Sequence, residues 1–393
     1  MTTQETDILL EEESRRTIER LIDEDPARAA LSLRKNGALI ATQIKYLQRA
    51  RTKLPSYYRA RCILPPLSFE QASSESTAET KRYAGRLCID LTCGLGVDAF
   101  HFSHRFERVV AVERDEELAR IARHNFALLG AHNIEVVCDE AERFVERFGG
   151  RADLIYVDPA RRGEGNRRLL LLEECSPNIL PLMPLLKKRA GRIVVKASPL
   201  FDVDEAFALL GEGIVVEAVS WGGECKELVI EVPGEETPAG AGTLRAVVAG
   251  KGTAEFPRTT APADRPAPMP RDSYRYLLVP DVAFYKTRTA QRYLHGLGAD
   301  MFSPTGYGFS DRAPEAFLGR IHPIEAILPY RPKTLKKELS ARGIARLDIL
   351  KKDFPLPAET IAKALGVKQG GTRQAAFTTI AGTQYAVLLE ERG

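Results

Sequence analysis

The chain has 393 residues, of which 44% are hydrophobic and 28% are charged. These values are typical of a globular protein and exclude a disordered, collagen-like or disulfide-stapled chain. At roughly 150 residues per domain, the length predicts two to four domains. No stretch approaches the roughly 18 uninterrupted apolar residues that span a bilayer, and the first five residues lack the basic start of a signal peptide. We therefore expect a cytoplasmic protein without membrane contact.

The six cysteines are scattered along the chain without any C-x-x-C pair. This spacing favours reduced thiols over a disulfide framework or a zinc site, and no metal is expected.

Basic residues are concentrated in two segments, although the net charge is only +3. Residues 26–61 contain nine Lys or Arg and no Asp or Glu, with Tyr46, Tyr57 and Tyr58 among them. From Arg320 to the end there are thirteen basic and seven acidic residues. Such stretches suit a nucleic acid, because cations displace condensed counterions and aromatic rings stack on unpaired bases. A solvated helix face is the alternative interpretation for either segment alone.

The hydrophobic pattern changes along the chain and predicts an α/β protein. Apolar residues at helical spacing indicate an N-terminal helical domain over 1–65, and a Ser/Thr/Glu-rich connector follows at 68–80. Short β-branched runs then alternate with helical stretches, which predicts a parallel sheet with helices on both faces. The last two runs are too close for a helical crossover and should form an antiparallel hairpin. The predicted strands are 87–91, 108–112, 134–138, 153–157, 192–196, 214–219 and 227–232.

Two smaller α+β units are expected after this core, which we place at 66–235. A Pro/Gly-rich connector at 233–242 separates the core from a unit at 236–322. The last unit, 323–393, reads as helix, strand, helix and two further strands.

Acidic and glycine residues follow the predicted strands in a pattern that indicates a nucleotide-like cofactor. The first strand ends in Asp90, and Gly94 and Gly96 let the backbone turn sharply and approach a ligand. Glu113 after the second strand suits a ribose. By themselves these residues also fit a dinucleotide fingerprint. Asp90 would repel a pyrophosphate, however, and suits the ammonium of a methionine moiety. Asp139 after the third strand could accept a hydrogen bond from an adenine amino group.

Several longer strings resemble S-adenosylmethionine-dependent class I methyltransferases, in particular a bacterial family with a C-terminal THUMP-like domain. The strings are DLTCGLGVDAF (90–100), VERDEELARIARHNFALLG (112–130), DPARR (158–162), KASPL (196–200), TKLPSYY (52–58), FEQASSESTA (69–78) and KKDFPLPAETIAKALGVKQGGTRQ (351–374). The resemblance implies a Rossmann-like seven-stranded sheet, an N-terminal helical domain, a small ferredoxin-like unit and a THUMP-like unit. It also implies a structured RNA, such as rRNA or tRNA, as the substrate. S-adenosylmethionine would be bound by Asp90, Thr92, Gly94, Gly96, Asp98, Glu113, Arg114, Asp139 and Glu140.

Three acceptor chemistries are distinguished by the residues after the fourth and fifth strands. For a base nitrogen, Asp158, Pro159 and Arg161 partly match the Asp-Pro-Pro-aromatic motif of amine-methylating enzymes. A C5-uridine enzyme needs a cysteine nucleophile after the fifth strand, where Lys196-Ala197-Ser198-Pro199 has none. For a ribose 2′-oxygen, Lys196, Asp158 and Glu227 resemble a K-D-K-E set, with Lys81 as the other lysine. The base nitrogen is favoured, with Asp158, Pro159, Arg161 and Lys196 as the catalytic residues.

Two other functions are compatible with parts of the pattern. A nucleotide-dependent oxidoreductase would use the glycine loop with NAD, but Asp90 and the D-P-A-R string disfavour it. A non-catalytic RNA-binding protein would keep a degenerate transferase fold. The sequence favours the methyltransferase.

Overall fold

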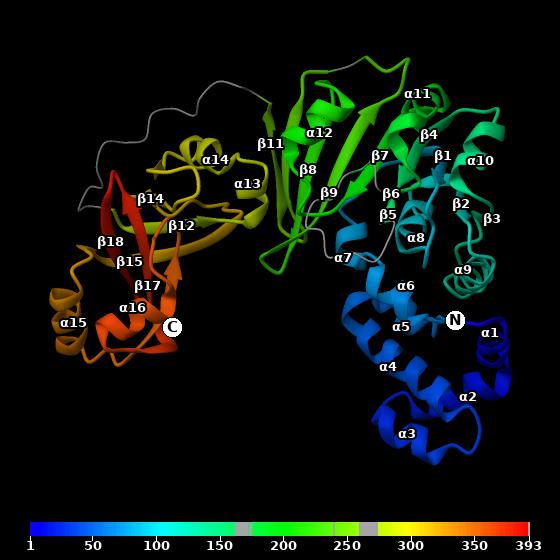
Figure 1. Ribbon diagram of the computed structural model, residues 1–393, viewed down its shortest axis with the longest axis horizontal. Coiled ribbons are helices and arrows are strands. Elements are labelled where there is room, and N and C mark those ends of the chain that lie inside the picture. The colour runs from blue at the N-terminus through cyan, green and yellow to red at the C-terminus, as the bar shows by residue number, and fades with distance from the viewer. Residues whose placement is uncertain (162–171, 173–174, 239, 259–273, 392–393) are drawn as a thin grey trace. The chain divides into compact units, whose positions relative to one another are not determined.

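The computed structural model describes residues 1–161, 172, 175–238, 240–258 and 274–391 (Figure 1). The chain divides into two compact units. The first comprises Met1–Trp221 with Lys226–Thr243, and the second comprises Gly222–Cys225 with Leu244–Gly393. The four domain ranges expected from the sequence stay a prediction. Within the described residues, no helix is long and apolar enough to cross a membrane.

The N-terminal part of the first unit is helical, as predicted. Its longest helix, α4, buries Ile40, Ile44 and Leu47 at spacings of three and four residues, which places them on one face. The expected connector at 68–80 instead contains most of α6 and all of α7. Its Ser, Thr and Glu residues therefore serve as helix caps and buried contacts, and Ser74 caps α7. The helices are α1 Thr3–Leu10, α2 Glu12–Leu21, α3 Pro26–Ser32, α4 Gly37–Lys53, α5 Pro55–Arg59, α6 Pro66–Gln71 and α7 Glu75–Ala78.

The large sheet contains all seven strands predicted for the core. Its hydrogen-bonded order is β11-β10-β8-β9-β7-β4-β1-β2-β3, so it has nine strands rather than seven. The additional strands β10 and β11 come from residues that the sequence assigned to the next unit. The strands are β1 Gly85–Asp90, β2 Phe106–Glu113, β3 Ile134–Cys138, β4 Ala152–Val157, β7 Ala190–Ala197, β8 Val215–Trp221, β9 Glu224–Pro233, β10 Thr243–Val248 and β11 Gly252–Pro257.

Pairing in the centre of this sheet is parallel, which brings the strand ends to one edge. Cys88 of β1 pairs with Val109 of β2 and with Leu154 of β4. The two strands of the predicted hairpin, β8 and β9, are neighbours in this sheet. Strand β9 also runs antiparallel to β7, where Val195 pairs with Ile230. Helices connect the parallel strands, and the strands read as continuous apolar runs because they are covered on both faces. These helices are α8 Val97–Ser103, α9 Glu116–Leu128, α10 Ala141–Arg147, α11 Ile179–Arg189 and α12 Val203–Leu210. The short strands β5 Ala160–Arg161 and β6 Cys175–Ser176 form a separate antiparallel pair after β4.

The second unit contains a seven-stranded sheet ordered β13-β14-β12-β15-β18-β17-β16. Strand β15 pairs with β12 at His322 and with β18 at Ile327. The residues before and after the expected boundary at 322/323 therefore share one sheet. The elements are β12 Tyr276–Pro280, α13 Val282–Lys286, α14 Ala290–Gly296, β13 Asp300–Met301, β14 Gly308–Ser310, β15 Gly319–Pro329, α15 Pro332–Ala341, β16 Arg346–Lys351, α16 Ala358–Leu365, β17 Lys368–Ile380 and β18 Thr383–Leu389.

Side chains of β17 point alternately to the two faces of this sheet and belong to two different apolar clusters. Phe377 packs in a cluster with Leu335 of α15 and Ile361 of α16. Ala376, its neighbour in the chain, belongs to a cluster with Leu277 and Phe309. Successive side chains of a strand point to opposite faces, so the sheet is covered on both sides.

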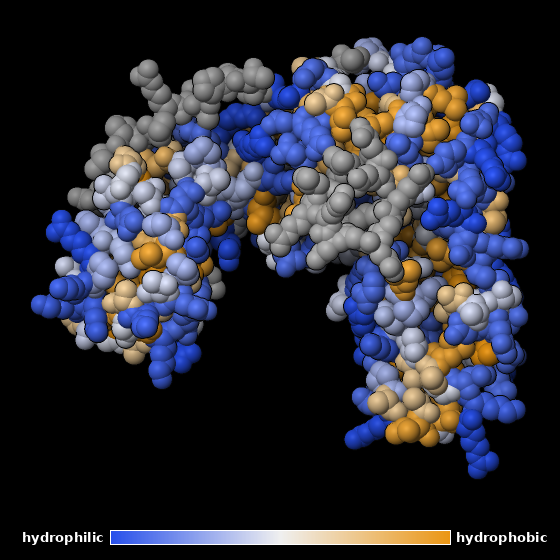
Figure 2. All heavy atoms as spheres, viewed as in Figure 1, coloured by the Kyte–Doolittle hydropathy of each residue, from blue (hydrophilic) through white to orange (hydrophobic). Residues whose placement is uncertain are grey.

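Large apolar side chains are also exposed at a few places. Leu31 of α3 is 89% exposed, and Figure 2 shows apolar side chains at the end of the N-terminal helices where α3 lies. Leu67 of α6 is 70% exposed. Single exposed apolar residues are ordinary in soluble proteins and assign no function by themselves.

Gly96 provides a test of the packing beneath the glycine loop. It has φ +84°, and a Cβ there would lie 2.4 Å from the ring of Phe126. Gly130 has φ +71° but no atom within 4 Å of such a Cβ. We expect Gly130→Ala to lower the free energy of unfolding by about 1–2 kcal/mol through backbone strain. Gly96→Ala should cost about 1–3 kcal/mol more, because overpacking is added. Urea denaturation measures both, and equal losses would contradict this packing.

Candidate active site

A cavity of about 910 Å³ lies at the carboxyl ends of the parallel strands in the first unit. Ligands of open parallel sheets bind at this edge, because the strands end there and the helices begin. The cavity is lined by twelve of the thirteen residues predicted for the site. These are Asp90, Thr92, Gly94, Gly96, Asp98, Glu113, Arg114, Asp139, Glu140, Asp158, Pro159 and Lys196. The thirteenth is Arg161, whose backbone pairs with Cys175 and whose side chain lies outside the described residues.

The glycine loop after β1 is fixed to the end of β2. The amide of Cys93 donates to the carbonyl of Val112 at 2.9 Å. The amide of Gly94 donates to Glu113 Oε2 at 2.8 Å, and the amide of Asp115 donates to Glu113 Oε1 at 2.9 Å. Glu113 thus holds the loops after β1 and β2 together, and carboxylate oxygens keep further lone pairs for ligand hydroxyls.

Asp90 is a buried acid that faces the cavity without a cation. The residue is 1% exposed, and its Oδ1 accepts a hydrogen bond from the Thr92 amide at 2.9 Å. Burial raises the pKa of Asp90 to about 8, the hydrogen bond from the Thr92 amide opposes this rise, and the nearby acids Asp98, Asp158 and Glu113 add to it. Among the described residues, no Lys or Arg forms an ion pair with it. A cationic ligand group in the cavity would supply the missing partner.

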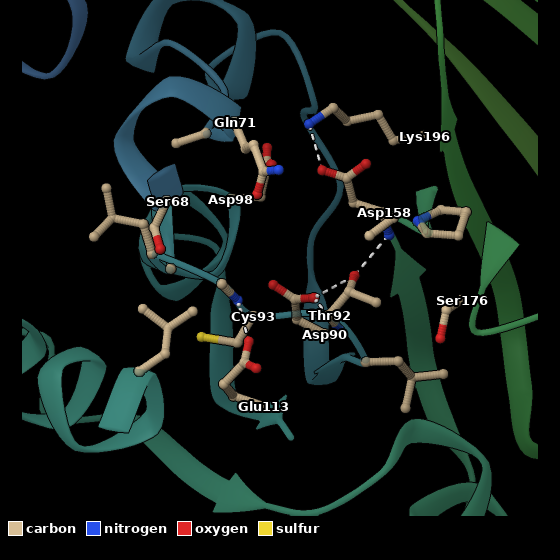
Figure 3. Close-up of a pocket in the computed structure, with 18 of the residues that line it drawn as sticks. Ser68, Gln71, Asp90, Thr92, Cys93, Asp98, Glu113, Asp158, Ser176 and Lys196 are labelled. Atoms are coloured by element: carbon tan, nitrogen blue, oxygen red, sulfur yellow. Dashed lines mark hydrogen bonds and ion pairs between the residues drawn. The ribbon is translucent and has the colours of Figure 1, made fainter. Parts of the chain in front are cut away.

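Thr92 connects the ends of β1 and β4. Its hydroxyl accepts a hydrogen bond from the amide of Asp158 at 2.7 Å and lies 3.4 Å from Asp90 Oδ1 (Figure 3). The backbone before Pro159 is therefore held close to the loop that follows Asp90. This contact gives Thr92 a structural role.

Asp158 and Lys196 form an ion pair across the ends of β4 and β7. Lys196 Nζ lies 2.5 Å from Asp158 Oδ2 (Figure 3). The same ammonium donates to Ser73 Oγ at 2.9 Å. Burial alone would lower the pKa of Lys196, but Asp158, Asp98 and Glu227 together raise it above its ordinary value. Lys196 is therefore an ammonium ion near neutral pH, and it holds the adjacent carboxylate in place.

Lys81 lies behind the cavity rather than in it. Its side chain is 0% exposed, and its Nζ is 3.1 Å from Asp98 Oδ1 and 2.5 Å from Glu227 Oε1. Lys81 is absent from the cavity lining, whereas Asp158, Lys196 and Glu227 are all part of it. The K-D-K-E set considered from the sequence is consequently not assembled with both lysines facing the cavity.

The remaining predicted residues lie at the end of β3 and after β2. Asp139 forms an ion pair with Arg147 and accepts from the Glu140 amide at 3.0 Å. Its backbone amide donates to the carbonyl of Glu113 at 3.1 Å. Arg114 Nη1 donates to Ser176 Oγ at 3.3 Å, which joins the end of β2 to β6.

The sequence analysis missed Ser73, Tyr156 and the α6 segment as parts of the site. Tyr156 Oη donates to Asp98 Oδ2 at 3.0 Å, and Ser73 Oγ donates to the same oxygen at 2.9 Å. Ser68 and Gln71 of α6 also line the cavity (Figure 3). The string FEQASSESTA included Ser73, so the resemblance marked the segment without revealing its contacts.

Comparison with known proteins identifies the class of this fold. A crystal structure of a proposed methyltransferase from Porphyromonas gingivalis matches with a TM-score of 0.85 and 25% identity, covering 100% of both chains. The fold is that of a methyltransferase. A family model described as THUMP domain-like matches residues 319–391. The predicted fold class, with its THUMP-like C-terminal unit, is confirmed.

Proteins with similar sequences are named as methyltransferases. An "Uncharacterized S-adenosylmethionine-dependent methyltransferase" of Mycobacterium tuberculosis is 28% identical over 307 residues, which are 77% of this chain and 80% of that protein. An "Uncharacterized RNA methyltransferase" of Thermotoga maritima is 27% identical over 29% of this chain and 28% of its own length. A 23S rRNA (uracil(747)-C(5))-methyltransferase of Vibrio vulnificus is 28% identical over 34% of this chain and 38% of its own. These relatives confirm the predicted enzyme class and its cofactor, S-adenosylmethionine.

Asp90 has no cationic partner in the part of the chain that the structure describes, which predicts that cofactor binding releases a proton. With its pKa near 8, Asp90 is mostly protonated at pH 7, and the ammonium of S-adenosylhomocysteine would favour its anion. Affinity should therefore rise as pH increases from 6 toward 8. Calorimetry at pH 7 in buffers of different ionisation enthalpy should detect release of close to one proton. Asp90→Asn should abolish this release, and a wild-type protein that releases none would contradict the role of Asp90.

Proposed function

We propose that this protein methylates a base nitrogen of a structured RNA, with S-adenosylmethionine as the methyl donor. The observation that carries the choice of acceptor is the Asp158–Lys196 ion pair at the cavity. The pair provides a fixed carboxylate, which can accept the proton of an exocyclic amine. It does not provide a neutral lysine, which a ribose hydroxyl would need as its base.

The cofactor half of the site would be formed by the ends of β1, β2 and β3. When bound, the cofactor supplies an electrophilic methyl group. Asp90 would hold its ammonium, Glu113 would accept from its ribose hydroxyls, and Asp139 would accept from its adenine amino group. These residues fit the group because Asp90 is a buried acid in need of a cation. The glycine loop beside it leaves room for close approach of the ligand.

The acceptor half would be formed by Asp158 and Lys196. Methyl transfer is an in-line displacement, so the protein must position the nucleophile and accept one proton. An aromatic amine is neutral and needs an acceptor for the proton that it loses. Lys196 donates its hydrogen bond to Oδ2 of the Asp158 carboxylate. The Asp158 side chain is 36% exposed at the cavity, so Oδ1 can receive an N–H of the base.

Ribose and C5 acceptors fit this site less well. A ribose hydroxyl requires a base to draw away its proton, but the pKa of Lys196 is raised by its acidic neighbours, and Lys81 does not reach the cavity. A C5 acceptor requires a cysteine nucleophile, and Ser198 follows β7 where one was expected. The similarity to a C5-uridine enzyme therefore supports RNA as substrate rather than C5 chemistry.

The surface for RNA is best placed on the THUMP-like region. In the basic segment 26–61, Arg49, Arg51 and Arg61 form ion pairs with acids outside the segment. These pairs reduce the charge that remains for phosphates. On α15, by contrast, Lys333, Lys336 and Lys337 are all exposed. Exposed lysines on one helix suit backbone phosphates.

Kinetics of two substitutions test the acceptor. We expect Asp158→Ala to lower kcat by about 100-fold or more, because the proton acceptor is lost. Lys196→Arg should retain part of the activity, since arginine keeps the positive charge beside Asp158 although its contact with Ser73 changes. For a ribose acceptor, Lys196→Arg would abolish turnover because guanidinium cannot give up its proton. The substrate is total RNA from a strain that lacks the gene. Nucleoside mass spectrometry should find the methyl on a base, and a methyl on ribose would refute the assignment.

Charge reversal tests the RNA surface. Lys333→Glu with Lys337→Glu should weaken binding of this RNA and make its salt dependence shallower, because fewer counterions are released. The matched control is Lys188→Glu with Lys251→Glu, which changes the net charge equally at exposed positions outside α15. Cofactor affinity should stay unchanged in both proteins. Equal loss of RNA binding in the control would remove α15 from the interface.

A further inference from the structure

A line of alternating charges runs from the interior of the first unit to the cavity. Lys81 lies between Glu227 and Asp98, at 2.5 Å and 3.1 Å. At the other end, Lys196 lies 2.5 Å from Asp158. The side chains of Lys81, Glu227, Asp98 and Lys196 are 0%, 4%, 10% and 13% exposed. Charges removed from water to this extent are costly unless each is paired, so the line is held in one arrangement.

The contacts of Asp98 and Lys81 determine that both side chains in this line are charged. Burial alone would raise the pKa of Asp98, but Lys81 and Lys196, together with the hydrogen bonds from Lys81 and Ser73, hold it below its ordinary value. Burial opposes the charge of Lys81, yet Asp98 and Glu227 raise its pKa above the ordinary value. Asp98 is therefore an anion fixed on α8, and it can orient the groups that donate to it.

Ser73 connects the inner and outer parts of this line. Its hydroxyl donates to Asp98 Oδ2 at 2.9 Å and accepts from Lys196 Nζ at 2.9 Å. A hydroxyl has one proton, so donation to Asp98 turns its lone pairs toward the ammonium. Ser73 lies between α6 and α7, in the segment that also lines the cavity with Gln71 and Ala72.

We propose that Ser73 is a positioning residue for methyl transfer: fixed by Asp98, its hydroxyl directs the Lys196 ammonium onto Asp158. This inference rests on the proposed function, because Asp158 is the group that meets the acceptor. Without the hydroxyl, the ammonium loses one of the two acceptors that it has among the described residues, and the carboxylate loses its fixed partner. The effect should fall on turnover rather than on binding, since neither Ser73 nor Lys196 is assigned to the cofactor.

Ser73→Ala tests this role in the full-length protein. We expect kcat on total RNA from a strain that lacks the gene to fall about 10- to 100-fold, as small displacements in an active site do. The KM for this RNA and the affinity for S-adenosylhomocysteine should not change. Ser73→Thr keeps the hydroxyl and should retain most of the turnover. Unchanged kcat in Ser73→Ala, or an equal loss in Ser73→Thr, would overturn the proposal.

A matched control and a structural readout complete the test. Ser103→Ala also removes a serine hydroxyl, from a half-buried residue at the C-terminal end of α8. This hydroxyl donates to the Phe100 carbonyl at 2.6 Å, and Ser103 does not line the cavity. The substitution should leave kcat unchanged. If Ser73→Ala does not fold, Ser73→Cys replaces it with the same expected loss. Wild-type protein that transfers no methyl to RNA would refute the proposed function alone. The Ser73→Ala crystal structure then decides the positioning role, and an intact Lys196–Asp158 contact would overturn it.

Discussion

Charges that leave water need partners inside the protein, and this constraint organises the edge where β1, β4 and β7 end. Burying an isolated ion costs several kcal/mol, so an acid or a lysine placed there fixes the residues around it. Lys196 is matched by Asp158, and Lys81 is matched by Asp98 and Glu227. The uncharged Thr92 extends the arrangement, because its hydroxyl ties the backbone of Asp158 to the loop after β1. The side of the cavity proposed for the acceptor and the side proposed for the cofactor are thus parts of one connected structure.

Asp90 is the exception to this pairing. It is buried and faces the cavity, and in the described residues it has hydrogen bonds from Thr92 but no cation. A site with one unmatched acid favours a ligand that brings a positive charge, which separates S-adenosylmethionine from the pyrophosphate of NAD. The oxidoreductase alternative, which shares the glycine loop, lacks support from this feature. Glu113 does not separate the two cofactors, because both have a ribose.

Strand-end residues could be predicted from the sequence because the rule behind them is local. β-Branched runs located β1, β2, β3, β4 and β7, and the carboxyl ends of parallel strands meet at one edge. Asp90 and Lys196, which are 106 positions apart, were therefore expected at one site. The K-D-K-E resemblance grouped Lys81 with Glu227, but the burial of Lys81 against Asp98, behind the cavity, could not be predicted because no local pattern joins these two residues. The connector was assigned from its composition, yet its serines cap α7 and contact Lys196. The continuous sheet through β15 was missed because both neighbouring pairings are long-range.

The central claim is that the cavity orients a methyl donor between Asp90 and the Asp158–Lys196 pair. A crystal structure of the protein with S-adenosylhomocysteine tests it most directly. The account predicts that the ligand ammonium lies within hydrogen-bond distance of Asp90 and that the ribose hydroxyls meet Glu113. The sulfur should then face Asp158. A ligand whose ammonium lies away from Asp90, or whose sulfur points away from Asp158, would contradict the account.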